Sequence, residues 1–100
     1  MRLSKFEIES IKKLSILHFG NGTKVSLFGS RIHNELKGGD IDLLIHVPKE
    51  SHSSVRAKIN FISDLMLTIG EQKIDVVIDS FEKTDNSTFL TTIRKTAIQL

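Results

Sequence analysis

The chain has 100 residues, of which 39% are hydrophobic and 26% charged, a composition typical of one soluble globular domain over residues 1–100. The formal charge of +2 is too small to indicate a nucleic-acid-binding protein by itself. No apolar run is long enough to cross a bilayer, and the first residues lack the features of a secretion signal. The absence of cysteine excludes disulfides and thiolate metal sites, and a cytoplasmic protein with no membrane partner is expected.

Seven elements are expected to alternate along the chain, starting and ending with a helix. Apolar residues at helical spacing predict helices over residues 4–18, 30–36, 55–69 and about 87–100. The last of these places four apolar residues on one side: Leu90, Ile93, Ala97 and Leu100. Apolar runs bounded by turn residues predict strands over residues 24–28, 41–47 and 73–79.

The connections between the predicted strands indicate how they pair. The second and third strands are joined by a helix of crossover length, so they are expected to be parallel with a right-handed connection. The first and second are joined by a short segment, and they must be antiparallel if their ends build a common site. The fold class is therefore α/β (α+β): a small mixed three-stranded sheet with helices packed on it.

Two aspartates open the second predicted strand. Residues two apart on a strand project from one face, with alpha carbons roughly 6.6 Å apart. Asp40 and Asp42 therefore form a pair of carboxylates, while Ile41 and Leu43 turn into the core. Aspartate is a poor strand former and costly to bury, so the pair requires a compensating cation.

A third aspartate, Asp75, lies at the start of the third strand, where parallel pairing would bring it beside Asp40 and Asp42. Three carboxylates without a histidine or thiol favour Mg²⁺ or Mn²⁺. Two such ions about 3.5–4 Å apart fit a cluster of this size. They would stabilise the attacking and leaving oxygens of an in-line phosphoryl displacement.

A phosphate site is expected where the first strand ends. Gly29 has no side chain to block a close approach, and Ser30 opens a helical turn whose free N–H groups attract phosphate. Arg31 and Lys37 are the nearest cations able to neutralise the charge of a phosphate, and Arg31 could bind it with two N–H groups. A phosphate site facing two metal ions describes a nucleoside triphosphate site. There an acceptor hydroxyl would attack the α-phosphate and release pyrophosphate.

Each of these residues also has a plainer interpretation. The three aspartates could be surface groups at strand ends, where turns recruit them. Ser30 could be a helix N-cap, a role compatible with phosphate binding, Arg31 a solvated residue and Lys37 a loop charge. The coincidence of three motifs favours the functional interpretation of the aspartates.

The remaining acidic and histidine residues near these motifs are assigned no catalytic role. Asp79 is expected in a turn at the far end of its strand, and His46 half-buried or exposed on the aspartate face. The other histidines are expected at the surface: His18, His33 and His52.

Three runs in order resemble the nucleotidyltransferase core shared by DNA polymerase β-like enzymes, in particular the minimal nucleotidyltransferases of bacteria and archaea. They are Phe28-Gly-Ser-Arg31, Gly39-Asp-Ile-Asp-Leu-Leu44 and Lys73-Ile-Asp-Val-Val77. The resemblance spans residues 24–79 and predicts the nucleotidyltransferase fold. Nine residues separate Ser30 from Asp40, one fewer than is usual in the minimal enzymes.

The resemblance also implies a role for each motif. Gly29 and Ser30 would hold the triphosphate, and Asp40 and Asp42 would bind both metals. Asp75 would bind the catalytic metal and help to activate the nucleophile. The implied reaction moves AMP from ATP to an acceptor hydroxyl.

Larger relatives carry a further domain that binds the acceptor, for which this chain is expected to have no room. The resemblance therefore implies an acceptor surface on a partner, with a helical HEPN-type protein adenylylated by an antitoxin as the leading context. Two other hypotheses stay open. One is a catalytically silent, antitoxin-like binding module, and the other is transfer to a small molecule, such as an aminoglycoside, or to an RNA end. The sequence leaves homo-oligomer formation open.

Overall fold

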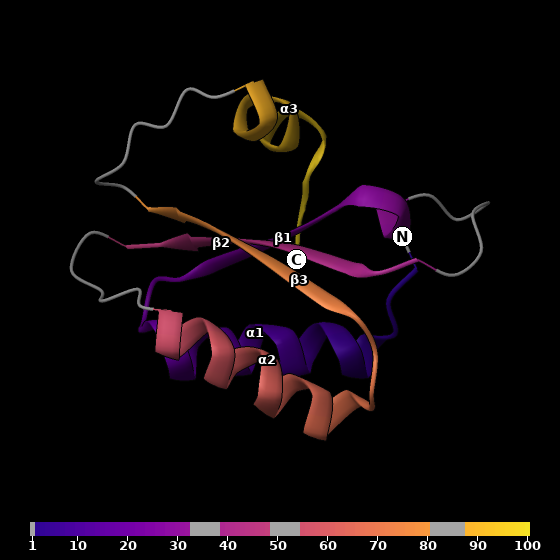
Figure 1. Ribbon diagram of the computed structural model, residues 1–100, viewed down its shortest axis with the longest axis vertical. Helices are drawn as coiled ribbons and strands as arrows, with labels where there is room; N and C mark the ends of the chain where they lie inside the picture. Colours follow the sequence, from indigo (N-terminus) through magenta and orange to yellow (C-terminus); the bar gives the residue numbers. More distant parts are fainter. Residues whose placement is uncertain (1, 33–38, 49–54, 81–87) are drawn as a thin grey trace.

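A computed structural model describes residues 2–32, 39–48, 55–80 and 88–100 (Figure 1). The elements in chain order are α1 (Lys5–Phe19), β1 (Lys24–Phe28), the short 3-10 helix η1 (Gly29–Ile32), β2 (Ile41–Val47), α2 (Val55–Ile69), β3 (Ile74–Ser80), α3 (Thr88–Thr96) and β4 (Ile98–Gln99). The predicted short helix over residues 30–36 is thus observed in its first part, and residues 33–38 lie outside the described residues, with Lys37 and His33 among them.

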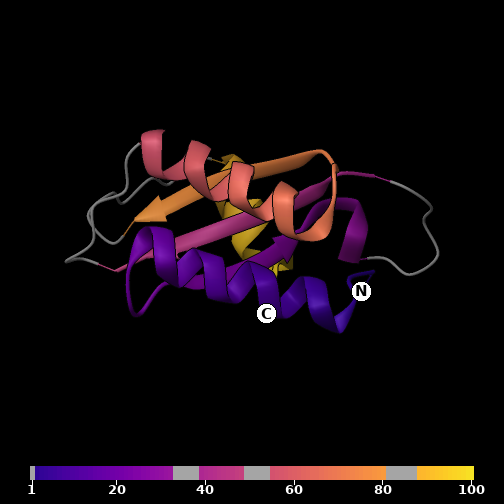
Figure 2. The same ribbon diagram turned by 90° about the horizontal axis from the view of Figure 1, so that it is seen from below.

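The strands form one mixed sheet in the order β3-β2-β1-β4. β2 pairs with β3 in parallel and with β1 antiparallel, which confirms both predicted pairings. α1 and α2 lie side by side across one face of the sheet, and α3 lies over the other face (Figures 1 and 2). The α/β fold class expected from the order of elements is confirmed.

The prediction of three strands is wrong by one, because the chain leaves the last helix earlier than expected. α3 ends at Thr96, and the residues that follow form β4, antiparallel to β1. The helical spacing of Ala97 and Leu100 misled the prediction. Without β4, the backbone groups along the outer edge of β1 would have no strand to pair with. β4 and the residue after it supply these partners; for example, the N–H of Leu100 donates to the carbonyl of Val25 at 2.9 Å.

The main core lies between the sheet and the pair α1 and α2. β2 is one of the two inner strands, and its residues Ile41, Leu43 and Ile45 are fully buried against these helices. A second, smaller cluster joins Leu44, on the opposite face of β2, to Leu90 and Ile93 of α3. Both faces of β2 are therefore covered over part of its length, which explains why its sequence is almost continuously apolar.

Side-chain contacts fix how α1 begins and how it packs on α2. A capping box begins α1: the Ser4 hydroxyl accepts from the N–H of Glu7 at 3.0 Å, and the Glu7 carboxylate accepts from the N–H of Ser4 at 2.9 Å. The prediction that His18 is a surface residue is wrong. Its Nε2 lies 2.7 Å from the Asp64 carboxylate on α2, and its ring meets the edge of Phe61. The local sequence did not reveal this contact because its partners are distant in the chain.

No helix in the described ranges is both long and apolar enough to cross a membrane.

Replacing Leu43 with alanine should destabilise the fold by about 2–5 kcal/mol, because the side chain is fully buried on β2, an inner strand of the sheet. The free energy of unfolding in urea measures the change. Leu67→Ala is the matched control, since Leu67 on α2 is 85% exposed and should lose less than about 0.5 kcal/mol. Equal losses in the two variants would contradict the placement of Leu43 in the core.

Candidate metal centre and active site

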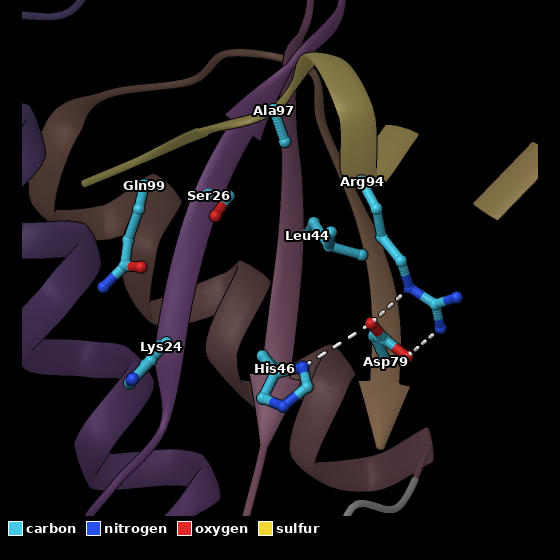
Figure 3. Close-up of a pocket in the computed structure, with 8 residues that line it drawn as sticks. All are labelled: Lys24, Ser26, Leu44, His46, Asp79, Arg94, Ala97 and Gln99. Atoms are coloured by element: carbon cyan, nitrogen blue, oxygen red, sulfur yellow. Dashed lines mark hydrogen bonds and ion pairs between the residues drawn. The ribbon is translucent and has the colours of Figure 1, made fainter. Parts of the chain in front are cut away.

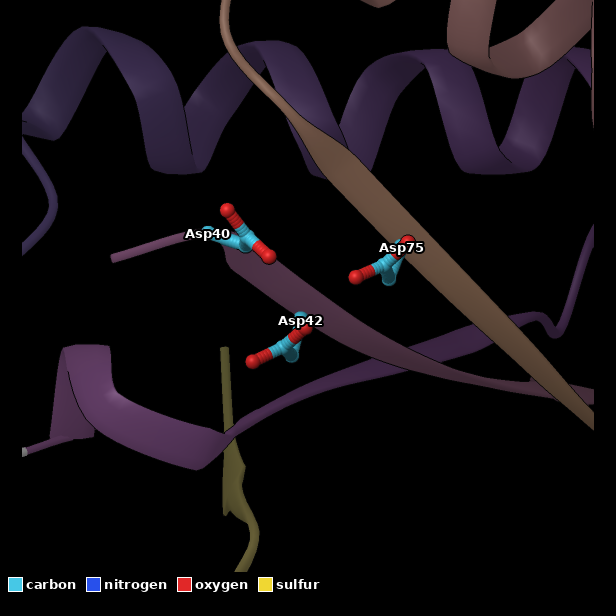
Figure 4. Close-up of side chains that lie close together, drawn as sticks. All are labelled: Asp40, Asp42 and Asp75. Atoms are coloured by element: carbon cyan, nitrogen blue, oxygen red, sulfur yellow. The ribbon is translucent and has the colours of Figure 1, made fainter.

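Three carboxylates gather where β2 and β3 begin (Figure 4). Asp42 of β2 lies directly opposite Asp75 of β3 in the parallel register, and Asp40 immediately precedes β2. One oxygen of each side chain lies within 4.8 Å of the others. The structure thus brings together the three aspartates that the sequence singled out, from segments more than thirty residues apart.

The crowding of the carboxylates is visible in the electrostatics of Asp42. Partial burial and the neighbouring charges of Asp75 and Asp40 raise the pKa of Asp42, although the ammonium group of Lys73 opposes the shift. A divalent cation bound among the three carboxylates would attract each of them and so offset their mutual repulsion. Such a raised pKa at a half-buried carboxylate with charged neighbours is typical of a functional site.

Gly29 ties the start of η1 to the carboxylates. Its φ of +77° lies in the left-handed region that glycine adopts without strain. A Cβ built on Gly29 would clash with the carboxylate of Asp42. Phe28, the preceding residue, is the register partner of Asp42 across the antiparallel pair. Glycine at this position therefore allows the backbone of η1 to approach the metal centre closely.

Lys73 is a residue near the site that the sequence analysis did not assign. Its ammonium nitrogen lies 3.5 Å from the Asp40 carboxylate, and its carbonyl accepts from the N–H of Ile41 at 3.0 Å. The expected parallel pairing of β2 with β3 could have placed Lys73 beside Asp40. If Asp75 lies beside Asp42, then the residue two positions earlier lies beside Asp40 on the same face.

Arg31 and Ser30 both lie in η1, as their motif requires. The guanidinium group of Arg31 donates to the side chain of Gln72 and to the carbonyl oxygens of Arg2 and Gly39. That Arg31 or Ser30 contacts phosphate stays a prediction.

A second polar cluster lies further along the same sheet face, in a groove of about 370 Å³ beside α3 (Figure 3). Asp79 lies there in β3 and is only 6% exposed, so the prediction of a turn residue is wrong. Its carboxylate accepts from Nε and Nη2 of Arg94 at 3.0 and 2.7 Å, and His46 lies 3.5 Å away. His46 is half-buried, as expected.

The ion pair explains why an aspartate is buried at this position. The hydrogen bonds from Arg94 outweigh the effect of burial, and with a smaller contribution from His46 they lower the pKa of Asp79. The sequence could not reveal the pair, because Arg94 reaches Asp79 only when α3 folds back over the sheet. Asp79 and Arg94 therefore fix α3 on the sheet.

The donor set at the strand ends fits a hard divalent cation. Carboxylate oxygens are the ligands that Mg²⁺ and Mn²⁺ prefer, and Asp40, Asp42 and Asp75 each direct one oxygen to a common point. Among the described residues no histidine takes part in this group. The three aspartates could hold one or two such ions.

Residues 8–98 match the nucleotidyltransferase domain family. Comparison with individual curated proteins gives no match. Because the family match covers most of the chain, the protein belongs to the nucleotidyltransferase domain family, and its reaction class is nucleotidyl transfer. The mixed sheet and the carboxylate site agree with this assignment.

The charge of Asp42 should destabilise the metal-free protein. The folded state holds the proton of Asp42 more tightly than the unfolded chain does, so stability falls as the pH rises through its raised pKa. Asp42→Asn removes this charge and should raise the melting temperature at pH 7 without metal.

Asp79→Asn should lower the melting temperature at pH 7, whereas Asp42→Asn should raise it. The lowered pKa of Asp79 means that its charge stabilises the fold above the usual carboxyl range, and this stability is lost as the pH falls through that lowered pKa. At pH 7 the variant should lose about 1–3 kcal/mol, since Arg94 loses its charged partner. Thermal unfolding of both asparagine variants tests the pair. A lower melting temperature for Asp42→Asn would contradict the repulsion of Asp42 by Asp40 and Asp75.

Binding of Mn²⁺ to the aspartates should weaken as the pH is lowered, because the ion must displace the proton that the raised pKa of Asp42 retains. Calorimetric titration of the nucleotide-free protein between neutral and acidic pH measures this dependence. Asp42→Asn should bind Mn²⁺ weakly at every pH. Affinity that is constant down to the ordinary pKa range of a carboxyl group would contradict the prediction.

Proposed function

We propose that the protein transfers a nucleoside monophosphate, AMP from ATP, to an acceptor hydroxyl with two Mg²⁺ or Mn²⁺ ions. The observation that carries this proposal is the meeting of Asp40, Asp42 and Asp75 within 4.8 Å beside the glycine that opens η1. The membership in the nucleotidyltransferase domain family supplies the reaction class.

In this reaction the acceptor oxygen bonds to the α-phosphorus, and the bond from that phosphorus to the bridging oxygen of the β-phosphate breaks. Pyrophosphate leaves. Asp40, Asp42 and Asp75 would hold the divalent ions, and these would supply charge neutralisation at the attacking and leaving oxygens. The Asp75 carboxylate, which is exposed, takes the proton of the acceptor hydroxyl.

The residues of η1 hold the triphosphate in this proposal. Gly29 allows the phosphates to approach the backbone, and the backbone N–H groups at the start of η1, including that of Ser30, donate to the phosphate oxygens. Lys73 adds positive charge beside Asp40, where the polyphosphate must arrive. The acceptor then enters from the exposed side of Asp75.

We infer that the acceptor belongs to a helical HEPN-type protein and that the chain acts as its antitoxin in the cytoplasm. The resemblance to minimal nucleotidyltransferases supports this context.

The first step of the test is to find whether the adjacent reading frame encodes a small helical HEPN-type protein. The second is transfer of label from α-³²P-labelled ATP to that protein, with Mg²⁺ or Mn²⁺ present. The wild-type protein should label the partner, and chelation of the metal should abolish the reaction. Asp42→Ala should reduce labelling by at least about 100-fold, because a metal ligand is lost. Excess unlabelled GTP, CTP or UTP should compete poorly.

Asp64→Ala is the matched control, because Asp64 lies on α2 and contacts His18 rather than the metal centre. Its labelling activity should stay near that of the wild type. A stable complex with the partner but no label under either metal would overturn the enzyme proposal in favour of a silent binding module. Label on added RNA or an aminoglycoside instead of the protein would overturn the proposed acceptor.

A further inference from the structure

The side chain of Arg31 reaches three separate segments of the chain. Its Nη1 donates to the carbonyl of Arg2 at 3.1 Å, and its Nη2 donates to Oε1 of Gln72 at 3.1 Å. Its Nε lies 3.4 Å from the carbonyl of Gly39. The backbone of Arg31 is held as well, since its carbonyl accepts from the N–H of Arg2 at 2.7 Å.

Two of these segments lead directly into the metal centre. Gly39 immediately precedes Asp40, and Gln72 immediately precedes Lys73, which is itself followed by the start of β3 and Asp75. A single guanidinium group therefore spans η1 and the segments before β2 and β3. These three segments carry the parts of the site that must keep a fixed spacing.

Gln72 extends the connection to α1. Its Oε1 accepts from Arg31, while its Nε2 donates to Oε2 of Glu7 at 3.2 Å and to the carbonyl of Ile69 at 3.4 Å. Glu7 is itself fixed by the capping box at the start of α1. The chain of contacts from Arg31 thus ends on the rigid first turn of a helix.

The charge of Glu7 reflects these contacts. Burial raises its pKa, but the hydrogen bonds from Ser4 and Gln72 outweigh burial, so the pKa lies below the usual value. Glu7 is therefore ionised at neutral pH and remains an acceptor for Gln72. The contact network is electrically balanced, because the positive Arg31 and the negative Glu7 lie at its two ends.

We propose that Arg31 is a positioning residue, which holds η1 at a fixed distance from Asp40 and Asp75 through Gln72 and the carbonyl of Gly39. Arginine usually binds phosphate with two neighbouring N–H groups, and here one N–H on each of the three nitrogens already has a protein acceptor. The inference rests on the proposed function, because it assigns the role of one residue at the same site.

The test measures Mn²⁺ binding to the nucleotide-free protein by calorimetry, in the wild type, Arg31→Ala, Gln72→Met and the double variant. Each single change should weaken Mn²⁺ binding about tenfold, because the segments that carry the ligands are no longer held. The double variant should bind no more weakly than Arg31→Ala, since both changes break the same connection.

Two further variants separate geometry from charge and from general damage. Arg31→Lys keeps the positive charge but has one donor nitrogen in place of the three in a planar guanidinium group, so it should lose as much Mn²⁺ affinity as Arg31→Ala. Gln99→Met makes the same substitution on β4, where Gln99 pairs with Ser26 of β1 and takes no part in the hydrogen bonds of Arg31 and Gln72, and it should bind Mn²⁺ like the wild type. Urea unfolding of every variant confirms that each is folded.

A direct contact between Arg31 and the nucleotide gives a different pattern. Arg31→Ala would then weaken binding of a non-hydrolysable triphosphate and leave Mn²⁺ affinity unchanged, and Gln72→Met would have no effect. That pattern would overturn the proposal, as would additive losses in the double variant or recovery of affinity in Arg31→Lys.

The measurement also separates this inference from the proposed function. If the wild type binds Mn²⁺ but transfers no nucleotide, the proposed function is overturned while the comparison of Mn²⁺ affinities still decides the role of Arg31. If the wild type binds no Mn²⁺, both are overturned.

Discussion

Repulsion among three carboxylates is the constraint on which the arrangement of this molecule depends. Asp42 and Asp75 are register partners on parallel strands, and Asp40 lies beside them. Like charges directly opposite one another destabilise a sheet. The pairing persists because the other faces of the same strands bury apolar side chains, among them Ile41, Leu43 and Val76. A one-residue slip of β2 would expose Ile41 and Leu43 and bury the aspartates.

The surroundings of the three carboxylates limit this repulsion without removing it. Lys73 lies beside Asp40, and Gly29 leaves space for the Asp42 carboxylate, whose raised pKa shows that the balance is incomplete. Asp79, on the same face of β3, is buried but fully compensated by Arg94. The contrast separates an aspartate whose charge is paired within the fold from three aspartates whose mutual repulsion the fold leaves incompletely balanced.

The sequence predicted those parts of the fold and site that depend on local periodicity. The strand β2 was predicted with its observed bounds, and the alternation of its residues placed Asp40 and Asp42 on one face. Prediction from the sequence failed where a contact between distant segments overrides a local pattern. Apolar residues at helical spacing continue past Thr96, yet the chain turns there into β4 because the edge of β1 offers backbone partners.

The sequence by itself determined that Asp75 lies beside Asp42, because a period of two and a crossover helix suffice to bring these two residues together. Only the tertiary structure decided what surrounds them. The acceptors of Arg31 and the partner of Asp79 lie in segments that meet only in the folded chain. The guanidinium of Arg31 binds Gln72, 41 residues away, and no local spacing encodes such a pairing.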